Sequence, residues 1–260
     1  MKRIESRDNK WVKRLNGLKI KKNRDKEGVF VAEGLRFIRE VPADWVVEVF
    51  AVSETFANEN DLSIYEQKAE VLCLPDVLFA AVCDTENPQG ILAVCKKLDW
   101  DETAVFAKKT PFLLLAEELN DPGNLGTVIR TADACGADGV FLSKGSVDLY
   151  NPKVLRSTMG SMFHVPVFQN VDLHDISAKL QENNIPLYAA HLKGDTYPYG
   201  LNLTDSCAFM IGNEARGLSD NAANLCDRWV KIPMPGQAES LNASIAAGVL
   251  MYEVVRQRLK

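Results

Sequence analysis

The sequence predicts an α/β protein in which a small α/β domain precedes a larger domain built on a parallel sheet. Residues 111–259 alternate between short apolar segments and segments with helical periodicity, a pattern typical of a parallel sheet covered by helices on both faces. Residues 1–99 also mix strand and helix patterns, with less hydrophobic strands. The polar residues 100–110 between them have no clear period and are expected to form a linker. We therefore expect domains at 1–99 and 111–260.

The elements of the first domain follow from turn residues and local pattern. Residues 28–34 are rich in β-branched side chains and predict a strand, and 35–41 predict a short helix that Pro42 stops. The later patterns predict strands at 45–53 and 69–75, a helix at 76–85, and a turn followed by a strand at 86–98.

The second domain is expected to alternate strands and helices up to its C-terminus. Strands are predicted at 111–119, 138–143, 165–169, 186–193, 206–212 and 229–234. Helices are predicted at 124–135, 151–163, 172–184, 219–226 and 240–259. The sequence contains no internal repeat.

The charge of the chain is distributed unevenly. Residues 1–26 hold eleven Lys and Arg against three acids, which gives +8, so the remainder carries −13 of the overall −5. A basic segment on an acidic chain is typical of phosphate binding, and so favours RNA as a partner. On charge alone, a solvated helix face or a disordered tail stays open. Apolar residues such as Trp11, Val12 and Leu15 interleave with the charges, and favour an ordered basic helix.

Composition excludes several classes of protein. No apolar run approaches the roughly 20 residues that span a bilayer, and residues 1–28 have no hydrophobic stretch of the kind found in secretory signals. A cytoplasmic location is therefore expected. The six cysteines and three histidines show no ligand spacing, so we expect reduced, buried thiols and no metal site.

In open α/β sheets ligands bind beyond the carboxyl ends of the strands, so we examine the residues that follow each strand. After the strand at 111–119, residues 120–124 (NDPGN) form a turn, and the helix behind it carries the apolar stripe Leu125, Val128, Ile129 and Ala132. Arg130 lies beside that stripe. Either its guanidinium reaches a cleft, or its aliphatic part packs on the sheet while the guanidinium lies in water.

Two further loops carry polar and glycine residues. The buried strand at 206–212 leads into Gly212, Asn213 and Glu214, where glycine would let backbone approach a ligand closely. The alternative is a tight strand-to-helix turn. The dinucleotide-binding pattern G-x-G-x-x-G is missing from the chain.

The last strand leads into IPMPGQAESLNAS, in which prolines flank Met234 and Gly236 allows a turn. Ser240 is a natural N-cap for the final helix, which has small residues at 243–248. This helix could pack closely on its own sheet or on another subunit. An ordinary capped amphipathic helix is the alternative.

Together and in this order, these three stretches resemble the motifs of the SpoU (TrmH-like) group of the SPOUT RNA methyltransferases. The stretches are NDPGNLGTVIRTADACGADGVF, IGNEARGLSD and IPMPGQAESLNASIAAGVLMYE. GVFVAEGLRFIREV and DTENPQGILAV are similar to the small substrate-binding domain that many members carry, so the resemblance covers nearly the whole chain. Ala215, Arg216 and Ala243 depart from the family pattern as we know it.

The resemblance implies S-adenosylmethionine as methyl donor, transfer to a ribose 2′-hydroxyl of RNA, a C-terminal trefoil knot and a homodimer. The positions that match the polar active-site residues of the family are Asn120, Arg130, Glu214, Ser240 and Asn242. The positions that match donor-binding residues are Gly212, Ile232 and Leu241; Met234 and Gly236 lie in the same loop, and Leu192 and Gly194 follow a strand where the pocket is expected to continue.

We hypothesise that Arg130 clamps the phosphate beside the target ribose and stabilises the developing alkoxide, since a guanidinium is no simple base. The phosphate or a neighbouring group would take the proton. Glu214 and Asn120 would orient the guanidinium, and Ser240 and Asn242 would hold the ribose or complete the donor loop.

Ribosomal RNA is the favoured substrate because of the N-terminal domain. Transfer RNA, a base-directed methylation, an inactive RNA-binding assembly factor and a nucleotide-cofactor enzyme for a small molecule remain alternatives.

Overall fold

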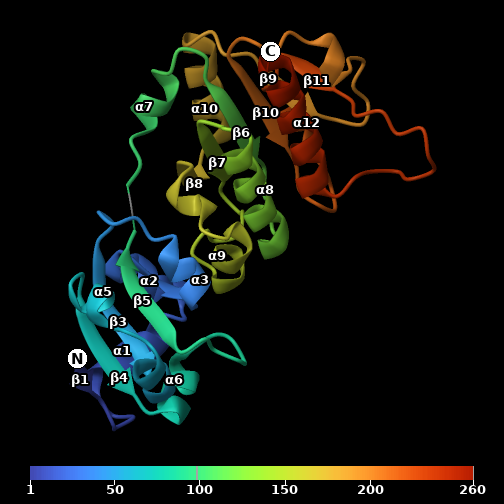
Figure 1. The fold of residues 1–260 in the computed structure, drawn as a ribbon. Coiled ribbons are helices and arrows are strands. Elements are labelled where there is room, and N and C mark those ends of the chain that lie inside the picture. Colours follow the sequence, from blue (N-terminus) through green and yellow to red (C-terminus); the bar gives the residue numbers. More distant parts are fainter. Residues whose placement is uncertain (98, 260) are drawn as a thin grey trace. The chain divides into compact units, whose positions relative to one another are not determined.

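The computed structural model describes residues 1–97 and 99–259 (Figure 1). Leu98, at the end of an expected strand, and Lys260, the last residue of the second expected domain, lie outside the described residues. The chain divides into two compact units. The first comprises Met1–Asp99 and Tyr150–Phe163, and the second comprises Trp100–Leu149 and His164–Lys260. No described helix is long and apolar enough to cross a membrane.

The first unit contains a five-stranded mixed sheet with the order β1-β4-β3-β5-β2. The expected strands are confirmed as β2 (Val29–Glu33), β3 (Val47–Ser53), β4 (Glu70–Leu74) and β5 (Ile91–Lys96), and a short edge strand, β1 (Lys2–Arg3), joins them. β5 runs antiparallel to both β2 and β3. The helices are α1 (Lys10–Gly17), α2 (Lys21–Glu27), α3 (Leu35–Arg39), α4 (Glu54–Glu59), α5 (Ser63–Glu66) and α6 (Asp76–Val82).

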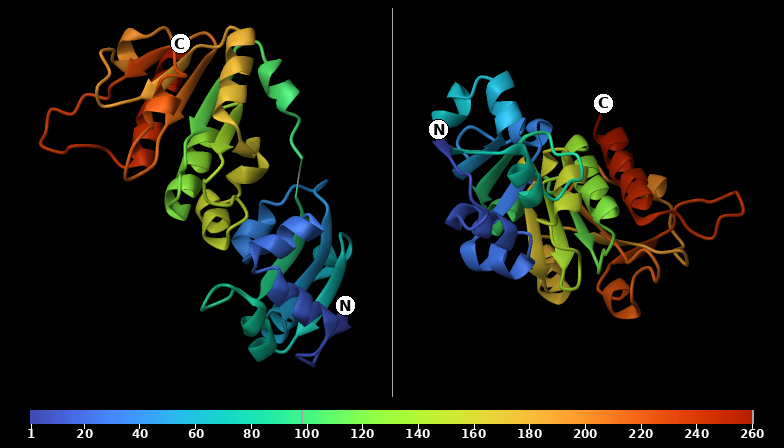
Figure 2. Two further views of the ribbon diagram at one scale, coloured as in Figure 1. Left: turned by 180° about the vertical axis from the view of Figure 1, so that it is seen from behind. Right: turned by 90° about the horizontal axis from the view of Figure 1, so that it is seen from below.

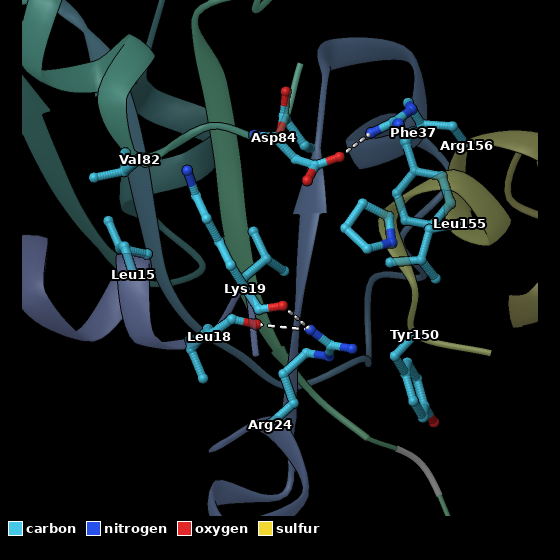
Figure 3. Close-up of a pocket in the computed structure, with 13 residues that line it drawn as sticks. Leu15, Leu18, Lys19, Arg24, Phe37, Val82, Asp84, Tyr150, Leu155 and Arg156 are labelled. Atoms are coloured by element: carbon cyan, nitrogen blue, oxygen red, sulfur yellow. Dashed lines mark hydrogen bonds and ion pairs between the residues drawn. The ribbon is translucent and has the colours of Figure 1, made fainter. Parts of the chain in front are cut away.

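The basic N-terminal segment is ordered, as expected from its interleaved apolar residues. Val12, Leu15 and Leu18 are buried in the same core cluster as residues of β3, β4 and α6. Arg24 is buried as well, and its guanidinium donates to the carbonyls of Leu18 and Lys19 at 2.9 and 2.8 Å (Figure 3). Part of the positive charge of this segment therefore holds the fold together.

The segment Tyr150–Phe163 packs within the first unit, although the sequence groups it with the second domain. It contains α9 (Pro152–Thr158) and a short 3₁₀ helix, η1 (Ser161–Phe163). The ring of Phe163 lies 5.4 Å from that of Phe37 and 4.8 Å from that of Trp45, and Arg156 pairs with Asp84 at 3.1 Å (Figure 3). Its aromatic side chains complete a core that residues 1–99 alone leave open.

The second unit contains a six-stranded sheet with the order β11-β9-β10-β6-β7-β8, and every neighbouring pair is parallel. The strands are β6 (Phe112–Ala116), β7 (Gly139–Ser143), β8 (Val167–Val171), β9 (Leu187–Ala190), β10 (Cys207–Ile211) and β11 (Arg228–Val230). β6, β7 and β10 are completely buried. The expected parallel sheet is confirmed.

Helices cover both faces of this sheet (Figures 1 and 2). α8 (Pro122–Ala134) and α12 (Ala243–Arg258) lie side by side on one face, and α10 (Leu173–Glu182) and α11 (Asp220–Ala223) cover the other. A short 3₁₀ helix, η2 (Pro198–Gly200), follows β9. The expected linker contains α7 (Glu102–Phe106), which Asp101 caps and which buries Val105 in the core of this unit.

Candidate active site

A cleft of about 330 Å³ opens at the carboxyl ends of β9, β10 and β11. Its walls come from the three loops that follow these strands and from the start of α12. This is the position where open parallel sheets bind ligands. Seven of the residues that the sequence singles out line it: Leu192, Gly212, Glu214, Ile232, Met234, Ser240 and Leu241. Gly194 and Gly236 do not line it.

A polar depression adjoins the cleft and shares Asn213, Glu214 and Ala215 with it. The remaining lining residues are Asn120, Asp121, Asn124 and Asn242. The structure thus brings together Asn120, Glu214 and Asn242. Asn120 and Glu214 are 94 positions apart in the chain, and Asn242 follows Glu214 by another 28. Glu214 belongs to both hollows, and so lies where they meet.

The carboxylate of Glu214 ties the loop after β10 to the start of α8. It accepts hydrogen bonds from the backbone N–H of Asn120 at 3.2 Å, from that of Asp121 at 2.9 Å and from the side-chain amide of Asn124 at 3.1 Å. Burial by itself would raise the pKa of Glu214, but these hydrogen bonds stabilise the anion and the net pKa is lowered. Glu214 is therefore an anion at neutral pH whose oxygens are already engaged.

The loop 212–219 is held to the end of β6 by further hydrogen bonds. The Asn213 amide donates to the carbonyl of Glu118 at 2.8 Å, the Glu118 carboxylate pairs with Arg216 at 2.5 Å, and Glu117 accepts from the Ser219 backbone and hydroxyl at 2.7 and 2.6 Å. These contacts give the loop one conformation.

Gly212 is required where the turn 213–217, closed by two backbone hydrogen bonds between Asn213 and Gly217, folds back onto the chain. A Cβ on this residue would lie 2.1 Å from the carbonyl carbon of Gly217 and 2.2 Å from the nitrogen of Leu218. Both are backbone atoms, which cannot move aside as the end of a side chain can. The sequence led us to expect that glycine lets the backbone approach a ligand here, with a tight turn as the alternative. The structure shows the tight turn, and the approach to a ligand stays a prediction.

Asn242, and not Ser240, is the N-cap of α12. The Asn242 side chain accepts from the backbone of Ser244 at 2.9 Å and of Ile245 at 3.3 Å, and it donates to Asn124 at 2.9 Å. The expectation of a Ser240 cap is wrong because the helix begins later, at Ala243, and Asn is as good a cap as Ser. Ser240 is instead an exposed residue on the wall of the cleft.

Arg130 lies on the exposed face of α8, opposite the buried Leu125, Val128 and Ile129. It lines neither hollow, and it forms no hydrogen bond or ion pair with residues 1–97 or 99–259. The oxygens of Glu214 are occupied by other donors. Within one chain, the structure therefore does not bring Arg130 to the groups that we expected to orient it.

Other residues of the cleft were not assigned to the site from the sequence. His191, Asn213, Arg216, Glu239 and Ala246 all line it. Asn213 and Arg216 flank Glu214, so proximity to that motif was a usable signal. His191 directly follows β9, and its position at a strand end was the only hint.

Two family models match the chain: the SpoU rRNA methylase family over residues 111–252, and the MRM3-like substrate-binding domain over 9–93. The chain is 36% identical to the 23S rRNA (guanosine(2553)-2′-O)-methyltransferase RlmP of Bacillus subtilis, over 98% of this chain and 99% of that protein. It is 30% identical to the 23S rRNA (uridine(2479)-2′-O)-methyltransferase of Streptomyces viridochromogenes, over 99% and 93%.

A solved structure shows the same agreement. The SpoU methyltransferase AviRb from Streptomyces viridochromogenes, in complex with the cofactor AdoMet, superposes with a TM-score of 0.87 at 29% sequence identity, over 97% of this chain and 99% of that chain. With its methylase motifs gathered at the strand ends of the second unit, the chain belongs to the SpoU rRNA methylase family.

Proposed function

We propose that this protein transfers a methyl group from S-adenosylmethionine to a ribose 2′-hydroxyl of 23S ribosomal RNA. The observation that carries the proposal is the cleft beyond β9, β10 and β11, which adjoins the polar group of Asn120, Glu214 and Asn242. The two curated relatives that match nearly the full chain carry names that state this reaction and this RNA.

The cleft suits the donor in size and chemistry. Its volume falls at the lower end of the range of small-molecule sites, and Ile232, Met234 and Leu241 give it apolar walls. Gly212 and Gly217 line the cleft, and since glycine has no side chain, the loop 211–217 is expected to offer backbone groups to the donor. We assign Gly212, Ile232, Met234, Leu241 and Leu192 to donor binding, but not Gly194 or Gly236.

The donor supplies a methyl group that its sulfonium already activates, so the main task of the protein is positioning. Glu214 fixes the start of α8 against the donor loop, and Asn242 fixes the start of α12 against α8. Asn120 lines the polar depression and Ser240 lines the cleft, and Glu214 belongs to both hollows. We assign the ribose to the point where the two hollows meet.

We propose that the protein is a homodimer formed through α12 and α8. Four apolar side chains on one side of the α12 region are exposed: Leu241, Ile245, Val249 and Tyr252. α8 lies beside this stripe, since a Cβ at Gly248 would be 3.8 Å from Thr131. Exposed apolar surface of this kind marks interfaces between proteins, and a twofold axis would pair the same surface on both chains.

In such a dimer Arg130 would act on the site of the partner chain. It is exposed on α8, beside the stripe, and Leu241 belongs both to the stripe and to the cleft. We propose that the guanidinium of Arg130 binds the phosphate next to the target ribose and stabilises the alkoxide as the proton leaves towards that phosphate or a neighbouring group.

RNA contact is assigned to the first unit. Lys10, Lys22 and Lys26 are exposed and without ion-pair partners among residues 1–97 and 99–259, so they are available to RNA phosphates. We propose a cytoplasmic location, where bacterial ribosomal RNA would be met. We also propose the trefoil knot of the family, on the basis of the match to the SpoU methylase model over residues 111–252.

The first test of this function uses methyl-labelled S-adenosylmethionine with purified 23S rRNA or total tRNA, followed by digestion to nucleosides. We expect label in a 2′-O-methyl nucleoside from 23S rRNA alone. Label in tRNA or on a base would overturn the substrate or the reaction, respectively.

The second test mixes two inactive variants, Arg130→Ala and Gly212→Val. If Arg130 acts across the dimer, random exchange gives one complete site in half of the dimers, and about a quarter of the activity returns. Activity that stays absent, although mixed dimers form, would place Arg130 in its own chain's site.

A further inference from the structure

His191 holds the turn that follows β9. Its Nδ1 accepts a hydrogen bond from the backbone N–H of Lys193 at 3.1 Å, its own carbonyl accepts from Gly194 at 3.0 Å, and its backbone N–H donates to Val230 at 3.0 Å. An imidazole that accepts through Nδ1 is neutral and carries its proton on Nε2. The turn 191–194 is therefore closed by one side chain in one protonation state.

The imidazole is braced from the neighbouring strand. It lies on the ring of Trp229 with 4.2 Å between centroids, and Trp229 in turn donates from Nε1 to the carbonyl of Ala223 in α11 at 2.9 Å. Both His191 and the adjacent Leu192 line the cleft, and Leu192 is exposed within it. The side chain of His191 thus connects the turn 191–194, which contains Leu192, to Trp229 of β11.

We propose that His191 is a positioning residue of the donor site, whose neutral imidazole fixes Leu192 against the donor, so that donor binding weakens when His191 is protonated. The proposal rests on the proposed function, because it takes this cleft as the donor site. Protonation removes the acceptor for the Lys193 N–H. It also places a cation in the cleft beside a ligand that carries a sulfonium charge.

The charged residues around His191 determine the pH at which its imidazole becomes protonated. Burial lowers the pKa of His191, and Lys193 lowers it further, whereas Asp220 on α11 acts in the opposite direction. Glu214, Arg216 and Glu239 are the other charged residues of the cleft. The neutral form, and the turn, are fully present above the ordinary histidine pKa of about 6.5 and are lost as the pH falls through the lower pKa of the folded protein.

The test is calorimetric titration of the intact protein with S-adenosylmethionine between pH 5 and 8. Three proteins are compared: wild type, His191→Asn, whose side-chain oxygen can accept from the same N–H without titrating, and His191→Ala. For the wild type we expect a constant Kd above pH 7 and weaker binding below pH 6. His191→Asn should bind within about twofold of wild type at pH 7.5 and show a flat profile, and His191→Ala should bind about three- to tenfold more weakly, the value of one hydrogen bond.

S-adenosylhomocysteine, which lacks the sulfonium charge, separates the two effects of protonation. At low pH the affinity for S-adenosylhomocysteine should still fall because the turn 191–194 loses its hydrogen bond. It should not show the further fall that repulsion between the imidazolium and the sulfonium causes for S-adenosylmethionine. The far-UV circular dichroism of all three proteins should be unchanged, and their RNA affinity should not differ.

Two results would overturn the role of His191 alone: wild-type affinity and pH profile in His191→Ala, or an unchanged pH profile in His191→Asn. A wild-type protein that binds no donor at any pH would instead overturn the proposed function itself.

Discussion

Gly212 is the residue at which a single methyl group should be least tolerated. A Cβ would lie 2.1 Å from the backbone of Gly217, in the turn that folds back onto Gly212, and overpacking of this kind costs about 1–3 kcal/mol or more. We expect Gly212→Ala to displace the loop 212–218, to lower the melting temperature and to abolish donor binding by calorimetry. Gly200→Ala is the matched control, because nothing lies within 4 Å of its Cβ position. Donor affinity that survives in Gly212→Ala would contradict the role of this turn in the donor site.

Asn242 and Ser240 should differ in what they contribute. Loss of an N-cap costs about 0.5–2 kcal/mol, so Asn242→Ala should lower the free energy of unfolding in urea by that amount, whereas Asn242→Asp should retain the cap. Ser240→Ala should leave stability unchanged and affect only turnover. Equal destabilisation by both alanine variants would mean that the helix is capped at Ser240 in solution.

The sequence could identify the residues that meet at the site, but not all of their roles. Asn120, Glu214 and Asn242 follow strands or begin helices in a parallel sheet, and the geometry of such sheets brings these positions to one edge. The exposure of Arg130 depended on where its helix sits against α12, which periodicity leaves open. Gly236 lies in the right loop but points to open space, because loop paths follow tertiary packing.

The exposed stripe of α12 should decide the oligomeric state. Val249→Glu places a charge in the middle of this stripe, and burying an unpaired charge is strongly unfavourable. We therefore expect a monomer by sedimentation velocity, with an unchanged circular dichroism spectrum and little activity. Val77→Glu makes the same change at an exposed valine in the first unit. A dimer that persists in Val249→Glu would exclude this surface.

The basic residues of the N-terminal segment should fall into two groups, one that binds RNA and one that stabilises the fold. Replacement of Lys10, Lys22 and Lys26 by glutamine should weaken RNA binding and lower the slope of log K against log salt by about one unit for each lost phosphate contact. Arg24→Gln should instead lower the melting temperature, because its guanidinium holds two buried carbonyls. An unchanged salt slope in the triple variant would move RNA binding to another surface.

Strand and helix patterns were strong predictors of which elements exist and weaker predictors of their ends. The expected strand at 229–234 is confirmed only as Arg228–Val230, since Pro233 and Pro235 cannot donate to a sheet ladder. The sequence did not predict α7. This short helix buries a single residue, Val105, and one apolar position is not enough to show a helical period.

At the scale of the whole molecule, the first unit depends on residues far along the chain. Phe163 is buried among Phe37, Trp45 and Phe30, and removal of a buried Phe side chain costs about 3–5 kcal/mol. We expect Phe163→Ala to lower the unfolding temperature of the first unit, measured by calorimetry, with donor affinity unchanged. Ile64→Ala, at an exposed position of the same unit, is the control. Loss of donor binding without any change in stability would contradict this assignment.

The division of the chain into its two units could not be derived from the hydrophobic pattern of the sequence. A helix at 151–163 between strands at 138–143 and 165–169 is what a crossover of a parallel sheet requires, so sequence reasoning assigned it to that sheet. In the structure its apolar side chains Leu155 and Phe163, together with the preceding Tyr150, pack in the first unit. Periodicity shows that a face is buried, but not which sheet buries it.

The discontinuous first unit has a consequence for biosynthesis. Domains that are continuous in sequence can fold as soon as they leave the ribosome, starting from the N-terminus. Here the partners of Phe37 and Trp45 are synthesised only after β6, α8 and β7 of the second unit. The nascent N-terminal sheet therefore lacks the Phe163 side chain that packs on Phe37 and Trp45 until residue 163 has emerged, so the first unit cannot complete its core before much of the second unit has been synthesised.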